Sequence, residues 1–388
     1  MKSGSMLLIH ISDTHLGYRQ YNLEEREKDF YEAFHQIVEQ AIEEHPDLIV
    51  HTGDLFDSSR PTPRALLEAT RAIKKALGHG IKVITIPGSH DMPKRRGVPP
   101  HALLEELGAI VLRSRRPYVV VEDTFIGGIE YTPRVFRNIL LEKLKDLSIE
   151  ASKYKKRILL LHQGIEQFLK FEHELVLDDI PKNFHYYALG HVHRRLVMDH
   201  GLGKLAYAGS TEVCSRDEYV DYLEVGKGAF LVDLSSDIPE VQRVDIDCIR
   251  PHLTRSIEAR TITDLMKEVE IIRKEVIGLR SRKKPVLHIK VRGDVDWQQL
   301  RRLFTDRLSD ILLTVRFETL SEEIEYEEIH IESINIRELI QRRLKDRKKT
   351  ELAYTLFNLL SQGDVESAHN LIEEFLKGEL HDIEEYKT

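Results

Sequence analysis

Histidine and aspartate side chains follow five apolar segments of this sequence, each where the segment ends. They lie in Asp13-Thr14-His15, Gly53-Asp54, Gly88-Ser89-His90-Asp91, His162-Gln163-Gly164 and Gly190-His191-Val192-His193. The apolar segments before them are typical of buried β-strands. Because open α/β sheets bind ligands at the carboxyl ends of their strands, we expect these side chains to meet at one edge.

The residue types predict a site for divalent metal ions. Asp13 and His15 are two positions apart at a strand end, so both side chains point to one side and can chelate an ion. Asp54 follows a glycine that lets the chain turn, and its two oxygens could bridge two ions. Nitrogen donors would come from His162, His191 and His193. Such mixed ligands suit manganese, iron or zinc better than magnesium or calcium, and two ions roughly 3.5–4 Å apart could bind a phosphate between them.

A structural role for these histidines is the alternative. The chain has 19 His, and a single His at a strand end usually packs or faces solvent. Chance does not explain five such strand ends in succession, so we favour the metal site. The two cysteines, Cys214 and Cys248, have no metal-ligand spacing, and we therefore expect ligands from His and carboxylates only.

The elements that must position these side chains form an α/β pattern. Helices are expected at 24–44, 62–78 and 99–107, with a strand at 47–52 between the first two. Later strands are expected at 118–122, 125–131, 157–162, 186–190, 196–199, 205–208 and 229–233, with a helix at 134–153. Two facing sheets with helices outside fit this order.

A smaller unit and a helical tail follow this core. A helix is expected at 262–278, a strand at 285–293, a helix at 295–309 and strands at 311–319 and 324–331. We therefore expect a main domain over 6–240, an α+β cap over 241–332 and a helical tail over 333–388. The apolar stripes of the tail contain Ile336, Leu339, Ile340, Leu344, Leu352, Leu356, Leu359, Leu360, Ile372 and Phe375. A tail of about 50 residues has little core of its own, so a partner surface is favoured over a self-contained bundle.

Charge and hydropathy limit the possible partners. The net charge of −8 argues against blanket electrostatic binding of nucleic acid, although basic loops near a metal centre remain possible. Arg60 and Lys94-Arg95-Arg96 follow two of the metal motifs, so we expect them at the rim of the site, where they could contact phosphate. The alternative is a solvated charged loop. No apolar window approaches the ~18 residues of a membrane span, and few cysteines fit a reducing cytoplasm.

Two predicted helices carry more apolar surface than their own sheet requires. The residues are Leu66, Leu67, Ile73 and Leu77 on the second helix and Leu103 and Leu104 on the third. This surface could form a contact between two copies of the chain, or it could pack entirely on the sheet of its own subunit.

The motifs together resemble a known family. The order D-x-H, G-D-x-x-D, G-x-H-D, H-Q-G and G-H-x-H is similar to the calcineurin-like metallophosphoesterase superfamily. Longer stretches, such as His15-Leu16-Gly17-Tyr18 and Tyr207-Ala208-Gly209-Ser210, resemble the SbcD-like family of archaeal double-strand-break repair nucleases. The resemblance covers residues 6–235, extends to the cap by position and size, and implies a metallophosphoesterase two-sheet core.

The resemblance also implies ligands and a catalytic acid. Two manganese ions are expected, one held by Asp13, His15, Asp54 and His193 and the other by Asp54, His162 and His191. His90 would be a histidine that stabilises the transition state or protonates the leaving oxygen without binding metal. The family has Asn where this chain has Ser89, so the second ion would bind less tightly here.

The partners implied by the resemblance are DNA ends, a second copy of the chain and an SMC-like coiled-coil repair ATPase. DNA would contact Tyr18, Arg19, Gln20, Arg60 and the basic loop, the apolar helices would form the homodimer, and the tail would bind the ATPase. The expected location is a prokaryotic, archaeal cytoplasm, in association with the nucleoid. The expected activity is 3′-to-5′ exonuclease and single-strand endonuclease action in break repair.

Two other functions compete with a nuclease. A small-molecule phosphatase or cyclic-nucleotide phosphodiesterase would share the core, but such an enzyme needs neither a cap nor a basic rim. A DNA-end-binding scaffold with impaired catalysis would follow from Ser89.

Overall fold

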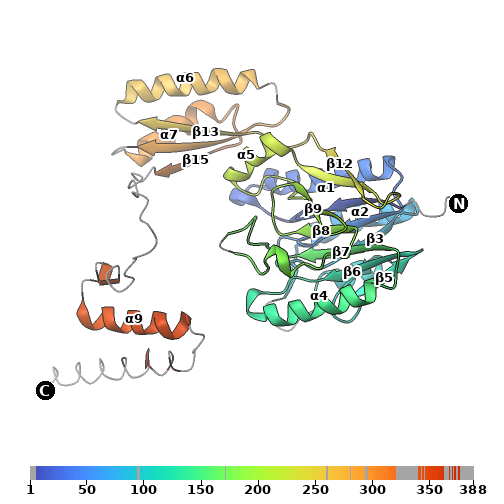
Figure 1. Ribbon diagram of the computed structural model, residues 1–388. Helices are drawn as coiled ribbons and strands as arrows, with labels where there is room; N and C mark the ends of the chain where they lie inside the picture. Colours follow the sequence, from blue (N-terminus) through green and yellow to red (C-terminus); the bar gives the residue numbers. More distant parts are fainter. Residues whose placement is uncertain are drawn as a thin grey trace. The chain divides into compact units, whose positions relative to one another are not determined.

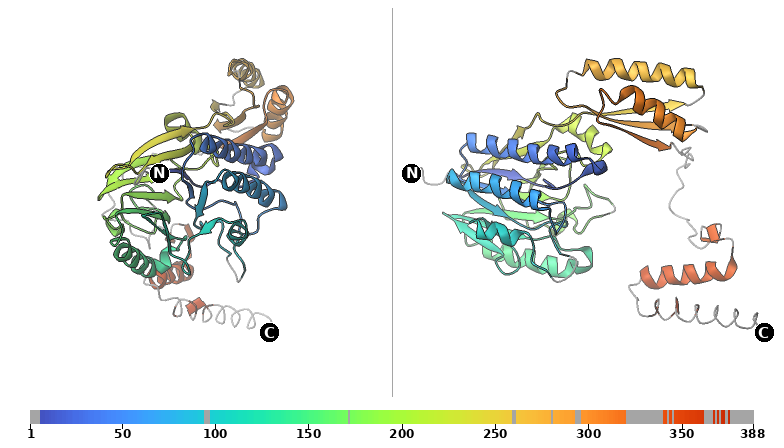
Figure 2. Two further views of the ribbon diagram at one scale, coloured as in Figure 1. Left: turned by 90° about the vertical axis from the view of Figure 1, so that its right-hand side faces the viewer. Right: turned by 180° about the vertical axis from the view of Figure 1, so that it is seen from behind.

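Two six-stranded β-sheets lie face to face, with helices on their outer sides (Figure 1, Figure 2). The computed structural model describes residues 6–93, 97–170, 172–258, 261–279, 281–292 and 296–319, and in the C-terminal part residues 340, 341, 343, 344, 346–361, 367, 369, 371, 372 and 375. Contacts divide the chain into two units, residues 1–320 and 321–388. The mixed α/β class and the two-sheet core predicted from the sequence are confirmed.

The first sheet has four parallel strands at one end. Its order is β12 (Glu240–Asp245), β11 (Gly228–Asp233), β1 (Leu7–Ile11), β2 (Leu48–His51), β3 (Lys82–Thr85) and β4 (Ile110–Val111). Strands β1 to β4 are parallel, whereas β11 and β12 pair antiparallel. The carboxyl ends of β1, β2 and β3 therefore lie side by side.

The second sheet repeats this arrangement. Its order is β5 (Tyr118–Val121), β6 (Thr124–Ile129), β7 (Lys156–His162), β8 (Tyr186–Gly190), β10 (Gly203–Tyr207) and β9 (Leu196–His200). Strands β6, β7, β8 and β10 are parallel. The ends of β7 and β8 are the places where two of the histidine motifs begin.

Alternation of side chains along the strands separates two layers of core. In β1, Leu8 packs between the sheets, while Ile9 packs on the outer helices. Those helices are α1 (Glu24–Glu43), α2 (Pro63–Gly78) and α3 (His101–Glu106), and α4 (Arg137–Ala151) covers the second sheet. The start of α2 agrees with the prediction, because the Thr62 side chain caps the helix by accepting from the Ala65 N–H (3.2 Å) and Pro63 occupies its first turn.

A three-stranded parallel sheet with two helices forms the smaller α+β unit. It contains β13 (His252–Glu258), α6 (Ile262–Gly278), β14 (Val286–Arg292), α7 (Trp297–Leu308) and β15 (Thr314–Thr319). Its own apolar core lies between the sheet and the helices. Since β12 pairs with β11, the first sheet continues to Asp245, and the three-stranded sheet begins with β13. The strand expected at 324–331 lies outside the described residues.

A buried carboxylate joins this unit to α1. Asp29 accepts from Arg26 of its own helix (2.5 Å), and from Arg250 (2.6 Å) and Lys283 (2.9 Å) at the base of the small unit. Burial alone raises the pKa of Asp29, but these three cations outweigh burial and lower it below the usual value. The small unit is therefore anchored by ion pairs that are shielded from water.

The C-terminal unit, residues 321–388, contains α9 (Arg347–Ser361). The Asp346 carboxylate accepts from the Lys349 N–H (3.0 Å) at the start of this helix, which is a favourable N-terminal cap. Among the described tail residues, Leu352, Leu356 and Leu359 are half-buried and Leu344 and Ile372 are exposed. Ile336 and Leu339 lie outside the described residues. None of the described helices has the length and apolar character of a membrane span.

Candidate metal centre

The predicted His and Asp side chains meet where parallel strands of both sheets end. Asp13 and His15 follow β1 and Asp54 follows β2, whereas His162 ends β7 and His193 follows β8. Contacts link the two sheets at this edge. The Nε2 atoms of His15 and His193 are 3.1 Å apart, and His162 Nε2 lies 3.2 Å from Asp54 Oδ2.

Unusual backbone geometry places these side chains. Asp13, His15, Asp54 and His191 have φ angles of 49°, 43°, 51° and 89°, in the left-handed region that non-glycine residues rarely adopt. Such conformations cluster at functional sites, because the surrounding structure must compensate for their cost. Four of the candidate ligands therefore lie at strained turns directly after strands.

Two glycines allow the loops to approach each other closely. A side-chain carbon at Gly88 would lie 2.2 Å from Asp54 Oδ1, and one at Gly190 would lie 2.2 Å from the Thr52 carbonyl oxygen. Any larger residue would force apart the loops after β2, β3 and β8. The glycines of the G-x-H-D and G-H-x-H motifs are therefore required by packing around Asp54 and His162.

The side chains of His15 and His193 form a first group of possible metal donors, and neighbouring carboxylates orient it. His193 Nδ1 donates to Glu218 Oε1 (2.9 Å), which directs Nε2 toward His15. Asp13 Oδ1 lies 4.0 Å from His193 Nε2, and both Asp13 oxygens accept from the His191 N–H (3.1 Å). A carboxylate that accepts from the other ring nitrogen, as Glu218 does here, fixes the tautomer of a metal-binding imidazole.

Asp54, His162 and His191 form a second group of possible metal donors. His162 Nδ1 donates to the Thr52 carbonyl (2.7 Å), so Nε2 is the atom left to bind an ion. The rings of His162 and His191 lie 5.1 Å apart, and Asp54, His162 and His191 each offer an atom within 4.8 Å of the others. The Ser89 hydroxyl donates to Asp54 Oδ2 (3.2 Å), and the His90 N–H donates to Asp54 Oδ1 (2.8 Å).

Burial and charge have opposite effects on the histidine pKa values. Burial lowers the pKa of His162, but the Asp54 carboxylate outweighs burial and raises it to about 9. The pKa of His15 also rises to about 9, because Asp57 outweighs burial. Burial and the charge of His162 lower the pKa of His191 to about 4. A cation that binds here must displace the protons of His162 and His15, so its affinity falls in acid.

The donor atoms fit two divalent metal ions. His162 Nε2 is buried and forms no well-aligned hydrogen bond, although it lies 3.2 Å from Asp54 Oδ2, so a cation could take both atoms as ligands. Asp54 belongs to two donor groups, one with His162 and His191 and one with His15 and His90. A carboxylate shared by two groups of imidazoles is the arrangement expected of a dinuclear site.

Three residues near the site have roles that the sequence did not reveal. Asp91 is fully buried and accepts from the N–H groups of Leu55, Phe56 and Gly88, so it joins the loops after β2 and β3. It belongs to the G-x-H-D motif, which was the available signal. Glu218 and Cys214 carry no such signal. The Cys214 sulfur also lies within 4.8 Å of a ring nitrogen of His15 and of His193, a proximity that the spacing of the cysteines does not indicate.

The predicted DNA-contacting residues occupy different environments. Arg60 is exposed and, with Asp57, Ser89 and His90, lines an open pocket of about 860 Å³ beside the metal site. Arg19 is exposed and Tyr18 is half-buried, with its ring 5.3 Å from that of Phe30.

Gln20 is buried, and both ends of its amide have protein partners, Cys214 and Arg26. Its side chain therefore does not face solvent. Lys94, Arg95 and Arg96 lie outside the described residues.

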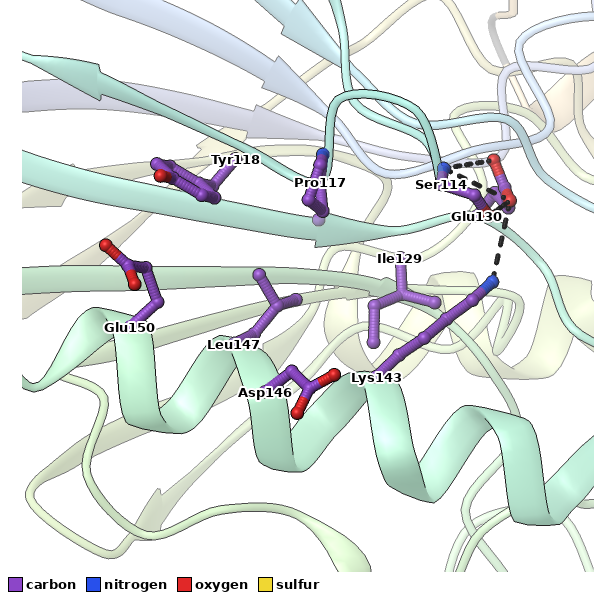
Figure 3. Close-up of a pocket in the computed structure, with 10 residues that line it drawn as sticks. Ser114, Pro117, Tyr118, Ile129, Glu130, Lys143, Asp146, Leu147 and Glu150 are labelled. Carbon is purple, nitrogen blue, oxygen red and sulfur yellow. Dashed lines mark hydrogen bonds and ion pairs between the residues drawn. The ribbon is translucent and has the colours of Figure 1, made fainter.

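A second pocket, of about 330 Å³, lies on the outer face of the second sheet (Figure 3). It is formed by α4 and the loop and strands around Pro117 and Ile129. Its charged side chains are Glu130, Lys143, Asp146 and Glu150. Three carboxylates and one ammonium group disfavour the binding of a phosphate ester in this pocket.

The apolar helix residues divide into two groups. Ile73 and Leu104 are buried in the core of their own subunit, and Leu66 and Leu77 pack partly against it. Leu67 and Leu103 are exposed, at 46% and 37%. Packing on the subunit's own sheet therefore accounts for most of the apolar surface predicted on these helices.

Comparison with known proteins agrees with the site geometry. Residues 6–195 match the model of the calcineurin-like phosphoesterase family. The DNA double-strand break repair protein Mre11 of Methanocaldococcus jannaschii is 40% identical over 293 residues, which cover 74% of this chain and 77% of that protein. The Mre11 protein of Saccharolobus solfataricus is 42% identical, covering 74% and 75%, and that of Sulfolobus acidocaldarius is 38% identical, covering 83% and 81%. With this similarity along most of both chains, and with phosphoesterase donor groups at the shared sheet edge, the chain belongs to the Mre11 family of calcineurin-like phosphoesterases.

Proposed function

We propose that this chain is a manganese-dependent DNA nuclease of double-strand-break repair, with 3′-to-5′ exonuclease and single-strand endonuclease activity. The observation that carries the proposal is Asp54, which joins two imidazole groups beside an open pocket. That pocket is bordered by Arg60 and His90. A phosphodiester could approach the metal centre through it, and family membership favours DNA as the substrate.

The proposed ligands draw on the side chains gathered around Asp54 and leave out His90. One ion would be held by Asp13, His15, Asp54 and His193, and the other by Asp54, His162 and His191, with Ser89 adjacent to the second. When bound, two such ions supply charge that polarises the phosphate and activates the attacking water. Mixed nitrogen and oxygen donors favour manganese over magnesium.

His90 is proposed as the general acid. Its Nδ1 donates to the Asp57 carbonyl (2.9 Å), and its ring is exposed to the pocket beside Asp54. Nε2 can then give a proton to the leaving oxygen of the sugar, because the ring is held in place by Nδ1 and by the backbone of His90. His90 lies close to His15 and Asp54, so a phosphate bound by ions at these residues would also be within reach of the His90 ring.

DNA would contact Arg60 at the pocket together with Arg19 and Tyr18, and Lys94, Arg95 and Arg96 are proposed as further contacts. Contacts from these residues to phosphate position DNA without reading its sequence. Buried Gln20 would instead hold the loop in place. A homodimer through Leu67 and Leu103, and an SMC-like ATPase bound to the tail, remain part of the proposal.

An assay with oligonucleotides and a small chromogenic phosphodiester tests the function. We expect manganese-dependent cleavage of DNA from 3′ ends, loss of cleavage with a chelator, and loss in Asp54→Ala but not in the control Asp146→Ala in the distant acidic pocket. Faster turnover of the small ester than of DNA would contradict a nuclease.

A DNA-end-binding scaffold is the second candidate. The observation that favours it is the Ser89 hydroxyl, which is engaged with Asp54 and offers a poorer ligand than an amide oxygen. The same assay separates the two functions, because DNA binding without cleavage at saturating manganese would identify the scaffold.

A further inference from the structure

His191 differs from two other candidate ligands in what orients its ring. One ring nitrogen of His162 donates to the Thr52 carbonyl, and one ring nitrogen of His193 donates to Glu218. An acceptor of this kind normally fixes the orientation of a metal-binding imidazole. In the part of the chain that the structure describes, the His191 backbone N–H donates a hydrogen bond, but neither ring nitrogen has a hydrogen-bond partner. Other contacts must therefore orient this ring.

Two neighbouring rings supply those contacts. The Tyr131 ring lies 5.7 Å from the His191 ring at an interplanar angle of 34°, and the His162 ring lies 5.1 Å away at an angle of 67°. Pairs of rings at such separations attract each other beyond the effect of apolar burial. Because His162 is itself a candidate ligand, Tyr131 is the one of these two neighbours that can act purely as a support.

Tyr131 is itself fixed by two loops that carry candidate ligands. Its N–H donates to the Pro87 carbonyl (3.0 Å) in the loop after β3, and its hydroxyl donates to Glu174 Oε1 (3.2 Å). The other carboxylate oxygen of buried Glu174 accepts from the Gly164 N–H (2.7 Å) in the loop after β7. With its ring against His191 after β8, Tyr131 therefore joins three loops of the metal centre.

We propose that Tyr131 is a positioning residue, which holds the His191 ring in the orientation that a metal ion requires. The inference rests on the proposed two-metal function. Without the Tyr131 ring, the imidazole of His191 could rotate about its side-chain bonds. Binding of an ion would then also have to order this ring, which lowers the affinity for the ion. Because His191 belongs to the donor group of Asp54 and His162, the loss should fall on the ion held by that group.

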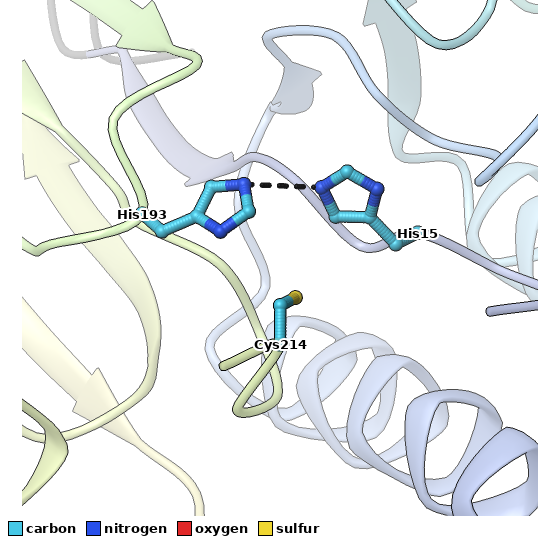
Figure 4. A group of neighbouring side chains, drawn as sticks. All are labelled: His15, His193 and Cys214. Atoms are coloured by element: carbon cyan, nitrogen blue, oxygen red, sulfur yellow. Dashed lines mark hydrogen bonds between the residues drawn. The ribbon is translucent and has the colours of Figure 1, made fainter. Parts of the chain in front are cut away.

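The first group of donors has a support of its own. Figure 4 shows the rings of His15 and His193 beside each other, with the Cys214 sulfur near both. Glu218 orients the His193 ring. Removal of the Tyr131 ring should therefore leave the first group in place, and only one of two bound ions should be affected.

Manganese titration of the full-length chain by calorimetry tests this role. Tyr131→Met and Tyr131→Leu remove the ring, and we expect either change to weaken the binding of one of two manganese ions by roughly 10–100-fold, the loss typical of a supporting group around a metal. Tyr131→Phe keeps the ring and should bind both ions nearly as tightly as the wild type. The matched control is Tyr118→Leu, which removes a ring on the edge strand β5 that stacks on Phe125 (5.0 Å), and it should bind both ions like the wild type.

Electron paramagnetic resonance separates positioning from a general loss of structure. At a manganese concentration that fills both positions of the wild type, the wild type and Tyr131→Phe should show the spectrum of two spin-coupled ions. The ring-free variants should show the spectrum of isolated ions at the same concentration. Tyr131 is half-buried, so we expect these variants to fold, and urea unfolding checks this.

The contrary outcomes are distinct. Wild-type affinity for both ions in the ring-free variants would overturn the positioning role, and so would equal weakening of both ions. A Tyr131→Phe variant as weak as Tyr131→Leu would show that the ring does not carry the effect. Failure of both ring-free variants to fold would overturn the inference as well, because the ring would then serve the fold as a whole. A wild type that binds fewer than two manganese ions would contradict the proposed two-metal function, and this inference with it.

Discussion

At the scale of single residues, His90 carries the clearest catalytic expectation. Its ring is held by the Asp57 carbonyl and exposed to the pocket, whereas His15 and His162 are buried and His191 and His193 are half-buried. His90→Ala should reduce DNA cleavage by roughly 10²–10⁴-fold, because a positioned proton donor is lost, and should leave manganese stoichiometry unchanged in calorimetry. The control is His79→Ala, because His79 is an exposed histidine directly after α2. Loss of one bound manganese in His90→Ala would show that His90 is a ligand.

Ser89 gives a second residue-scale prediction. Its hydroxyl donates to Asp54 but is shorter than an Asn amide, so Ser89→Asn should tighten binding of one manganese ion and raise the cleavage rate at low manganese. The effect should reach roughly 10–100-fold, by analogy with the loss of supporting groups around a metal. A manganese titration of cleavage measures it.

Ser89→Ala serves as the matched comparison. If the serine only donates to Asp54, the alanine variant should bind manganese nearly as well as the wild type. Equal activity of Ser89→Asn and wild type at every manganese concentration would show that position 89 is not a weak ligand.

The candidate ligands were predictable because each follows an apolar strand in a short motif. Asp91 also lies in such a motif, but its contacts, like those of Glu218 and Cys214, are not indicated by the spacing. Their importance depends on the backbone N–H groups and imidazole rings that they contact across the fold. Glu218 and Cys214 do not follow a strand that ends in a candidate ligand. Sequence spacing carries no record of such contacts, so only the folded chain reveals them.

At the scale of elements, the long periodic segments were predicted closely and the irregular ones were missed. Helices α1, α2 and α6 agree to within about one residue at each end, because their apolar stripes and caps are clear. The missed elements are β4, β12, β13 and α5. Strand β12 is a largely exposed edge strand and α5 has no buried residue, so neither shows the pattern of a half-buried element.

The proposed dimer contact is a prediction at the same scale. Leu67 on α2 and Leu103 on α3 are exposed, so charges there should leave the subunit core intact. A double variant, Leu67→Glu with Leu103→Glu, should be monomeric in light scattering and bind DNA less tightly, because a buried charge without a partner carries a large penalty. Activity on short substrates should persist.

Leu202→Glu is the control for this experiment, because Leu202 is an exposed leucine in the loop between β9 and β10. An unchanged dimer mass in the double variant, or a monomeric wild type, would exclude this contact surface.

At the scale of the whole molecule, Asp29 joins the smaller α+β unit to the two-sheet core. Its pKa is lowered by Arg250, Arg26 and Lys283, so the unfolded carboxyl binds protons more readily than the folded one. The stability gained is therefore fully present above the unfolded pKa of about 3.9 and is lost as the pH falls through the folded pKa.

Asp29→Asn should lower the free energy of unfolding by about 3–5 kcal/mol at neutral pH, because it leaves buried cations without compensation. The difference from the wild type should shrink in acid. Urea unfolding at several pH values measures it, with Glu24→Gln as the control, since that carboxylate on the same helix is exposed and its ion pair with Lys28 is screened by solvent. Equal losses in the two variants would contradict an anchoring role for Asp29.

The central claim is a dinuclear metal centre that includes Asp54. Anomalous scattering from crystals grown with manganese tests it most directly. We predict two peaks, one near Asp13, His15 and His193 and one near His162 and His191, with the Asp54 carboxylate between them. A single peak, or peaks away from these residues, would contradict the account.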